Sequence, residues 1–321
     1  MEKKIPVIAV VGPTATGKTA LGVALARRFG GEIVSCDSMQ VYKGLPIGTA
    51  QPSAEELGEI PSHLTACLEL NTAFSVSDYV IEAAKIIQAV YVRKRLPILV
   101  GGTGLYARSL LRGFDFKENA RNDDLRAQLF KQAEECGPDR LYEELKARDP
   151  EAAAEIHPNN LKRVIRALEY CQLSGEPFSK QARRSQTAVS PYRSLMLCLA
   201  YHDRQKLYER INARVDVMLA RGLLEEAKYL HDQLRNGVAP TAAQAIGLKE
   251  FFRYFDGEIP LEEAVEDVKR ESRRYAKRQI TWFSREPEAE FVYADDYSDV
   301  QDMVDACSEK VKRFLSEEEC P

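Results

Sequence analysis

The chain has 321 residues, 45% of them hydrophobic, and a formal net charge of −4. This length indicates one large domain or two modest ones, and the charge argues against a polycation. No apolar run approaches the roughly 18 residues of a membrane span. The seven cysteines are scattered, without C-x-x-C spacing, as is typical of reduced thiols. We expect a cytoplasmic protein without disulfides or a membrane segment, and a monomer.

The first predicted elements are a strand and a helix joined by a glycine loop. Residues 5–11 form an apolar run of the buried-strand type, and residues 19–27 favour a helix. The run between them fits G-x-x-x-x-G-K-[ST], a phosphate-binding loop. This arrangement points backbone N–H groups and the positive end of a helix at one anion. The loop that we expect to bind polyphosphate comprises Gly12, Pro13, Thr14, Ala15, Thr16, Gly17, Lys18 and Thr19.

Further strand-like runs alternate with helical patterns along the chain. This alternation predicts an α/β fold: a P-loop NTPase-like parallel sheet with helices on both faces. Gly101-Gly102-Thr103-Gly104 forms a second strand–glycine–helix junction, at the sheet edge where open α/β folds bind ligands. The predicted strands are 7–11, 32–36, 96–100, 195–200 and an edge strand at 290–293. The predicted helices of this part are 78–93, 105–111, 206–220, 223–235, 261–283 and the acidic tail.

Residues 116–190 differ in character from the rest of the chain. They hold no convincing strand and contain helical stretches at 123–136, 139–148 and 161–173. We interpret them as an all-helical insertion domain, 116–190, in a catalytic core of residues 1–115 and 191–321. The helix at 161–173 fits either part.

Positive charge gathers in two stretches, residues 161–193 and residues 269–285. Each stretch carries seven lysines and arginines against one or two glutamates. Such stretches bind a nucleic-acid backbone or form solvated helix faces, and charge alone does not decide between the two.

Asp37 directly follows the second predicted strand. A carboxylate at the carboxyl end of a strand can hold the water shell of a metal ion or act as a general base. The structural alternative is that Asp37 caps a turn or a helix.

The residues after Asp37 resemble a known family, the tRNA dimethylallyltransferases (isopentenylpyrophosphate transferases). That family shares a D-S-x-Q-x-Y-[KR]-x-x-x-I-G-T-A run, matched here by residues 37–50. The resemblance continues in order over nearly the whole chain. It covers Gly101-Gly102-Thr103-Gly104-Leu105-Tyr106, His157-Pro158-Asn159-Asn160, Arg163, Arg166-Ala167-Leu168-Glu169, Gln244-Ala245-Ile246-Gly247 and the run from Tyr275 to Phe283. This chain departs from the family pattern at Gln51, where a lysine is common, and around Ser62, where a histidine is common.

The resemblance implies transfer of a dimethylallyl group from dimethylallyl diphosphate to the exocyclic amine of the adenosine 3′ of a tRNA anticodon. The phosphate loop then holds the leaving diphosphate, and Thr19 holds Mg²⁺. Asp37 is implied as the general base, and Thr103 as the residue that orients the amine. Arg214 is a candidate second diphosphate contact, with a surface ion pair as its alternative.

The target base must leave the stacked anticodon loop to react, and loop recognition relies on stacking and base-edge hydrogen bonds. We expect Met39, Gln40 and Val41 to read or replace the extruded base, and Asp37 and Ser38 to contact the tRNA beside it. The other residues that the resemblance implies for binding the tRNA anticodon stem-loop are Lys162, Arg163, Arg166, Gln244, Gly247, Lys277 and Arg278.

Three other functions share some of these features. A small-molecule kinase also has a phosphate loop, but neither the residue 37–50 run nor two basic helices. A prenyl transferase acting on free AMP or ADP does not need the extra helical mass. A non-catalytic nucleic-acid-binding module leaves the phosphate loop and Asp37 unexplained.

Overall fold

The computed structural model describes residues 4–114, 122–187, 189–238 and 241–317. The chain divides into two compact units. A core unit contains the chain up to Leu111 and from Pro191 onward, and a helical unit contains Arg112–Ser190. The expected first boundary, between residues 115 and 116, lies outside the described residues.

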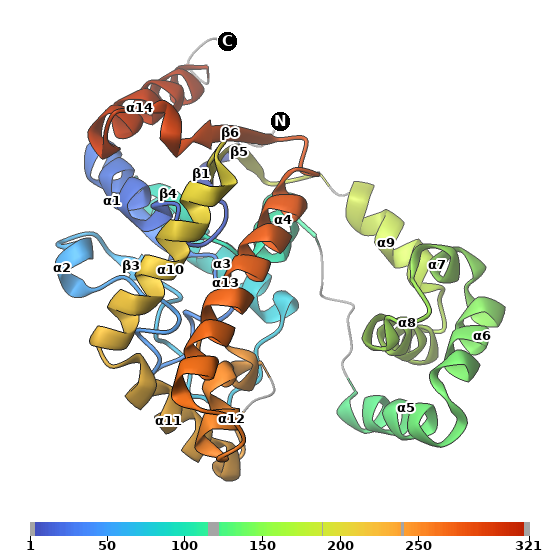
Figure 1. Cartoon of the computed structure of the whole chain (residues 1–321). Helices are drawn as coiled ribbons and strands as arrows, with labels where there is room; N and C mark the ends of the chain where they lie inside the picture. The colour runs from blue at the N-terminus through green and yellow to red at the C-terminus, as the bar shows by residue number, and fades with distance from the viewer. Residues whose placement is uncertain (1–3, 115–121, 188, 239–240, 318–321) are drawn as a thin grey trace. The chain divides into compact units, whose positions relative to one another are not determined.

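In the described parts of the chain, six strands form one parallel sheet in the order β3-β2-β4-β1-β5-β6 (Figure 1). The α/β prediction is therefore confirmed, including the edge strand β6. The two-residue strand β3 was not expected, because so short a segment has no periodicity to detect. The strands are β1 (Ile5–Val11), β2 (Gly31–Ser35), β3 (Ser62–His63), β4 (Leu96–Gly101), β5 (Tyr192–Ala200) and β6 (Ala289–Tyr293).

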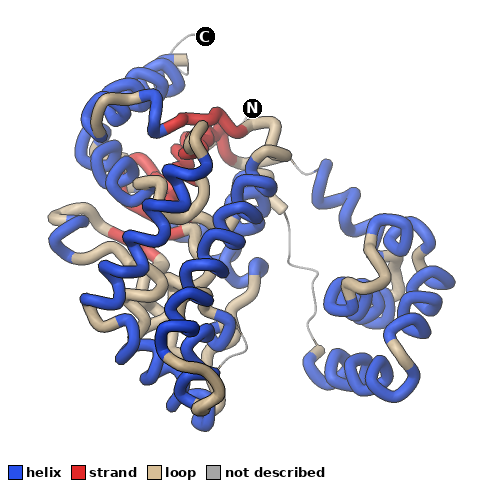
Figure 2. Tube along the Cα trace, in the orientation of Figure 1, coloured by secondary structure: helices blue, strands red, loops and turns tan. Residues whose placement is uncertain are grey.

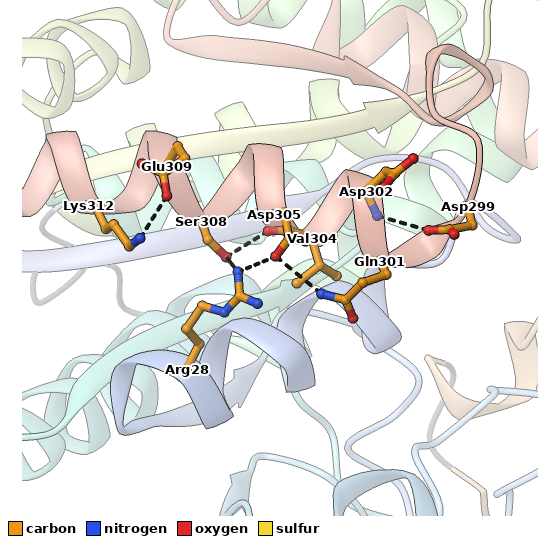
Figure 3. Close-up of polar contacts among 9 residues, drawn as sticks. All are labelled: Arg28, Asp299, Gln301, Asp302, Val304, Asp305, Ser308, Glu309 and Lys312. Atoms are coloured by element: carbon orange, nitrogen blue, oxygen red, sulfur yellow. Dashed lines mark hydrogen bonds and ion pairs between the residues drawn. The ribbon is translucent and has the colours of Figure 1, made fainter.

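One face of the sheet is covered by α1 (Lys18–Phe29) and α14 (Val300–Ser316). Leu21 and Leu25 of α1 pack with Ile8 of β1 and Val304 of α14, all buried. Beside this apolar contact, Arg28 of α1 donates hydrogen bonds to Asp305 at 2.6 Å and to Ser308 at 2.8 Å (Figure 3). The helix that follows the phosphate loop thus packs against the sheet and beside the C-terminal helix.

The other face is covered by α3 (Val76–Val92) and α4 (Gly104–Leu111). Tyr79 of α3 stacks on Tyr106 of α4 with ring centroids 4.1 Å apart. Figure 2 shows the helices of this unit around the red strands. Among the described helices, none has the length and apolar character of a bilayer-spanning segment. The remaining helices of the core unit are α2 (Ala54–Leu57), α10 (Arg204–Ala220), α11 (Leu223–Gln233), α12 (Phe252–Phe255) and α13 (Leu261–Phe283), with short 3₁₀ turns at Leu234–Asn236, Ala242–Gln244, Lys249–Phe251 and Ala294–Asp296.

The helical unit has its own core, built from buried side chains such as Leu141, Leu145 and Leu168. Its charged centre is Glu169, whose carboxylate is fully buried. Arg126 and Arg166 donate to this carboxylate at 2.7 and 2.8 Å. Although burial alone raises the pKa of Glu169, the hydrogen bonds from these arginines lower it. The helices are α5 (Asp123–Cys136), α6 (Pro138–Arg148), α7 (Pro150–Glu155), α8 (Leu161–Ser174) and α9 (Phe178–Thr187).

We predict that Glu169→Gln destabilises the helical unit by about 1–3 kcal/mol, because it weakens a buried hydrogen-bonded ion pair. Glu135→Gln is the matched control, since Glu135 is an exposed partner of Lys131, and surface pairs contribute little. Urea unfolding followed by hydrogen exchange measures the effect unit by unit. Equal stability of the two variants would contradict the role assigned to Glu169.

Candidate active site

The geometry of the phosphate loop requires its two glycines, Gly12 and Gly17. Gly12 has φ +130°, and a Cβ there would lie 2.3 Å from the carbonyl oxygen of Leu199 in β5. Gly17 has φ +94° and precedes α1 without a side-chain cap. Inside the loop, Thr16 Oγ1 and Lys18 Nζ both donate to the carbonyl of Pro13, at 2.9 and 2.6 Å. The uncapped start of α1 therefore presents its N–H groups beside Lys18, as an anion site requires.

The second glycine junction meets the loop that carries Asp37. A Cβ on Gly101 would lie 2.1 Å from the carbonyl oxygen of Cys36, so only glycine allows this approach. Thr103, two residues after Gly101, donates its N–H to the same carbonyl of Cys36 at 3.1 Å. Its hydroxyl accepts from the N–H of Ser38 at 3.0 Å. Thr103 therefore lies against the residue that follows Asp37, as well as at the start of α4.

The surroundings of Asp37 act on the pKa of its carboxyl in opposite directions. Burial raises the pKa of its carboxyl, whereas the N–H of Met39, which donates to it at 2.9 Å, and the positive charges of Lys18 and Arg214 oppose this rise. Burial, aided by repulsion from Arg214 and opposed by Asp37, lowers the pKa of Lys18 to about 8. Arg214 comes from α10, and burial lowers its pKa too. The three groups therefore share one partly desolvated site, and Arg214 faces this site from α10.

The donor set of this site is compatible with Mg²⁺. The described residues contain no group of three or more His, Cys, Asp or Glu side chains that would hold a metal ion. A metal bound here would take its ligands from the Thr19 hydroxyl, phosphate oxygens and water. That is the chemistry of Mg²⁺, which prefers oxygen ligands and keeps several waters.

Gln40 points into the protein rather than outward. Its amide donates to the carbonyls of Thr49 and Ala50 at 3.2 and 2.9 Å and accepts from the hydroxyl of Ser35 at 3.0 Å. Ser38, Met39 and Gln40 are all half-buried. The amide of Gln40 is used to brace the loop, which leaves Ser38 and Met39 as the residues of this run beside Asp37. Val41 is fully buried, so the expectation that it reads the extruded base is wrong.

The residues expected to contact tRNA fall into two groups. Lys277 and Arg278 are exposed on α13, and Gln244 is exposed in a 3₁₀ turn. Gly247 is buried with φ +97° and donates its N–H to Glu250 at 2.8 Å. In the helical unit, Lys162 and Arg163 are exposed, and Arg166 is paired with Glu169.

The two departures from the family pattern have structural contacts. Gln51 donates to the carbonyls of Gln40 and Tyr42 at 3.1 and 2.7 Å, so its amide braces the loop after Asp37. Near Ser62, the ring of His63 contacts the buried carboxylate of Glu32 at 2.7 Å. The ring of His63 therefore has a structural partner in Glu32.

Three residues at the site were not identified from the sequence. Tyr275 of α13 hydrogen-bonds Thr103, and burial and the charge of Asp37 raise its pKa. Glu226 of α11 accepts the N–H groups of Ile47 and Gly48, both at 2.7 Å. Gln279 of α13 contacts both glycine loops. Tyr275 and Gln279 lie in the run that resembles the family, but a helical pattern alone does not separate them from packing residues.

Comparison with known proteins identifies close relatives over most of the chain. The IPP transferase family model matches residues 40–286, and the isopentenyl transferase model matches residues 5–66. A tRNA dimethylallyltransferase of Caldanaerobacter subterraneus subsp. tengcongensis is 46% identical over 300 residues, covering 93% of this chain and 95% of that protein. The tRNA dimethylallyltransferase of Bacillus velezensis is 47% identical over 281 residues, covering 88% of each.

Solved structures agree with these sequence matches. The tRNA isopentenylpyrophosphate transferase of Bacillus halodurans has a TM-score of 0.73 and 41% identity, covering 99% of this chain and 98% of that one. A eukaryotic dimethylallyltransferase crystallised acting on tRNA has a TM-score of 0.82 and 29% identity, covering 98% of this chain and 80% of that one.

We predict that inorganic diphosphate binds this site and that its affinity falls as pH rises through about 8. The reason is that Lys18, whose pKa in the free protein is about 8, attracts the anion only while protonated. Calorimetric titration between pH 6.5 and 9.5 measures the effect. Because diphosphate itself loses protons in this range, the contribution of Lys18 is read from the ratio of the wild-type affinity to the Lys18→Met affinity, which should fall as pH rises through about 8. A ratio that does not change across this range would contradict the assignment.

Proposed function

Because this chain belongs to the IPP transferase family and is a prenyl transferase, we propose that it transfers the dimethylallyl group of dimethylallyl diphosphate to tRNA. The acceptor is the exocyclic amine of the adenosine on the 3′ side of the anticodon. The observation that carries this proposal is that Asp37, Lys18, Arg214 and Thr103 lie close together in one site. The phosphate loop and the carboxylate of Asp37 lie together there, as transfer with loss of diphosphate requires.

The phosphate loop acts on the leaving group. As the bond between C1 of the allyl group and the diphosphate oxygen breaks, negative charge grows on the diphosphate. The N–H groups at the start of α1, Lys18 and Arg214 stabilise that charge most when the bond is nearly broken. Mg²⁺ held by Thr19 and the phosphate oxygens would supply further charge neutralisation.

Asp37 acts on the nucleophile. The lone pair of the adenine amine is delocalised into the ring, so the amine becomes acidic only as its bond to C1 forms. The carboxylate of Asp37 then accepts one amine proton, and the product is the N6-alkylated base, diphosphate and a protonated Asp37. The hydrogen bond from the N–H of Met39 to Asp37 fixes the orientation of the carboxylate. Thr103, held by the N–H of Ser38, orients the amine.

Recognition of tRNA rests on the exposed cations. Lys277 and Arg278 on α13, with Lys162 and Arg163 on α8, are available for phosphates of the anticodon stem-loop. Arg166 contributes indirectly. It pairs with Glu169 on the same helix, α8, and Glu169 in turn pairs with Arg126 of α5. A free mononucleotide needs none of these contacts, so the exposed cations favour tRNA over AMP as the acceptor.

Asp37→Asn tests the proposal directly. We expect turnover of unmodified tRNA with labelled dimethylallyl diphosphate and Mg²⁺ to fall by roughly two to four orders of magnitude, because the amide cannot accept the proton. Binding of tRNA should be retained, as a filter-binding assay will show. Glu288→Gln, on an exposed residue, is the control. Near-normal turnover of Asp37→Asn would exclude Asp37 as the base, and label entering AMP but not tRNA would exclude the proposed acceptor.

The acid limb of the pH profile gives a second test. Burial raises the pKa of Asp37, so protonation removes the base at a pH above the usual range of an aspartate. We therefore expect kcat/KM to fall as pH decreases through this raised pKa. The residual activity of Asp37→Asn should show no such limb. An acid limb that survives unchanged in Asp37→Asn would assign it to another group.

A further inference from the structure

Gln279 lies in the last turns of α13, is 5% exposed, and uses both ends of its side-chain amide. Its oxygen accepts the backbone N–H of Thr14 in the phosphate loop at 3.0 Å. Its nitrogen donates to the backbone carbonyl of Gly102 in the second glycine junction at 2.9 Å. One planar group therefore connects two loops that are far apart in sequence.

Each of these contacts lies next to a residue of the proposed reaction. Thr14 follows Pro13, whose carbonyl receives Lys18 Nζ at 2.6 Å. Gly102 precedes Thr103, whose hydroxyl accepts the N–H of Ser38 at 3.0 Å. A displacement of the amide of Gln279 therefore alters the donor side and the acceptor side of the site together.

The packing around this contact leaves little room for independent movement. A Cβ on Gly102 would lie 2.2 Å from Nε2 of Gln279, and a Cβ on Gly104 would lie 2.2 Å from Cε3 of Trp282. α13 thus packs directly against the backbone of Gly102 and Gly104 in the second glycine junction, where there is no side chain. Because close-packed interiors transmit small shifts rather than absorb them, the amide of Gln279 behaves as a link between the loops.

We propose that Gln279 is a positioning residue that couples the two substrate sites, so that binding of the donor diphosphate raises the affinity for the acceptor RNA and the reverse. The inference rests on the proposed function, since it needs both ligands. An anion bound by the phosphate loop fixes the position of Thr14, and the hydrogen bond from the Thr14 N–H then fixes the amide of Gln279. The amide in turn holds Gly102, and hence Thr103, in place for the acceptor. The coupling is reciprocal, as thermodynamic linkage requires.

The first test measures that coupling with Gln279→Met, which keeps the length of the side chain and removes both hydrogen bonds. Calorimetry gives the dissociation constant of inorganic diphosphate, with Mg²⁺, in the absence and presence of a saturating unmodified anticodon stem-loop. For wild type we expect RNA to strengthen diphosphate binding at least about fivefold. For Gln279→Met we expect each ligand alone to bind within about threefold of wild type, and the enhancement to fall below about twofold.

The second test uses Gln279→Glu, which keeps the shape of the side chain. A neutral carboxyl at this position can accept from Thr14 and donate to Gly102, whereas an ionised one repels the Gly102 carbonyl. Turnover of this variant relative to wild type should therefore rise as pH falls, roughly tenfold for each pH unit in the range where the carboxyl is still mostly ionised. A purely structural glutamine gives a ratio that does not change with pH.

Glu263→Gln on the exposed side of α13 is the matched control, and thermal unfolding verifies that all variants are folded. The inference is overturned if active wild type shows no enhancement, if Gln279→Met keeps it in full, or if the Gln279→Glu ratio is flat with pH. In those cases transfer by wild type still supports the proposed function. A wild type that transfers no dimethylallyl group to tRNA overturns both.

Discussion

The parallel pairing of β2, β4 and β1 is the constraint on which the candidate site depends. Parallel strands end at the same edge of a sheet, so the loops after Ser35, Gly101 and Val11 emerge side by side. The close approach of the loop after β2 requires glycine at Gly101, where a Cβ would lie 2.1 Å from the carbonyl oxygen of Cys36. The neighbouring strand β5 requires glycine at Gly12, where a Cβ would lie 2.3 Å from the carbonyl oxygen of Leu199. The chemistry of the site follows from this edge. One loop supplies the anion site, one supplies the carboxylate, and one supplies Thr103.

Burial shifts the pKa values of Asp37 and Lys18 in opposite directions. It raises the pKa of Asp37, which makes the carboxylate a better proton acceptor, and lowers the pKa of Lys18 to about 8. Each group opposes the shift of the other, because a carboxylate and an ammonium group stabilise one another's charged forms. The cost of removing both from water is thereby reduced while the proposed base and the proposed anion contact are kept in one place. In the proposed reaction, Arg214 adds positive charge where the leaving group would develop negative charge.

The sequence predicted the parts of the fold that carry strong local signals. The phosphate loop, the strand-end position of Asp37 and the second glycine junction follow from short motifs, and helices such as α5 and α13 follow from long periodic patterns. Short elements such as β3, α2, α7 and α9 were not predicted, because they are too short or too polar to show periodicity.

The contacts of Gln279, Tyr275 and Glu226 were also beyond sequence reasoning. Each joins segments far apart along the chain, such as Gln279 with Thr14 and Gly102, and a local pattern carries no information about such partners. The family resemblance implied an RNA contact for Arg166, and the structure adds a partner that the sequence did not reveal, the buried Glu169.

The central claim, that the phosphate loop holds a leaving group while carbon is transferred, is tested most directly with dimethylallyl diphosphate carrying ¹⁸O in the bridging C1–O position. The account predicts that tRNA gains the dimethylallyl group and that all of the ¹⁸O leaves in the diphosphate. Transfer of phosphate to the acceptor, or ¹⁸O retained on the RNA, would contradict it.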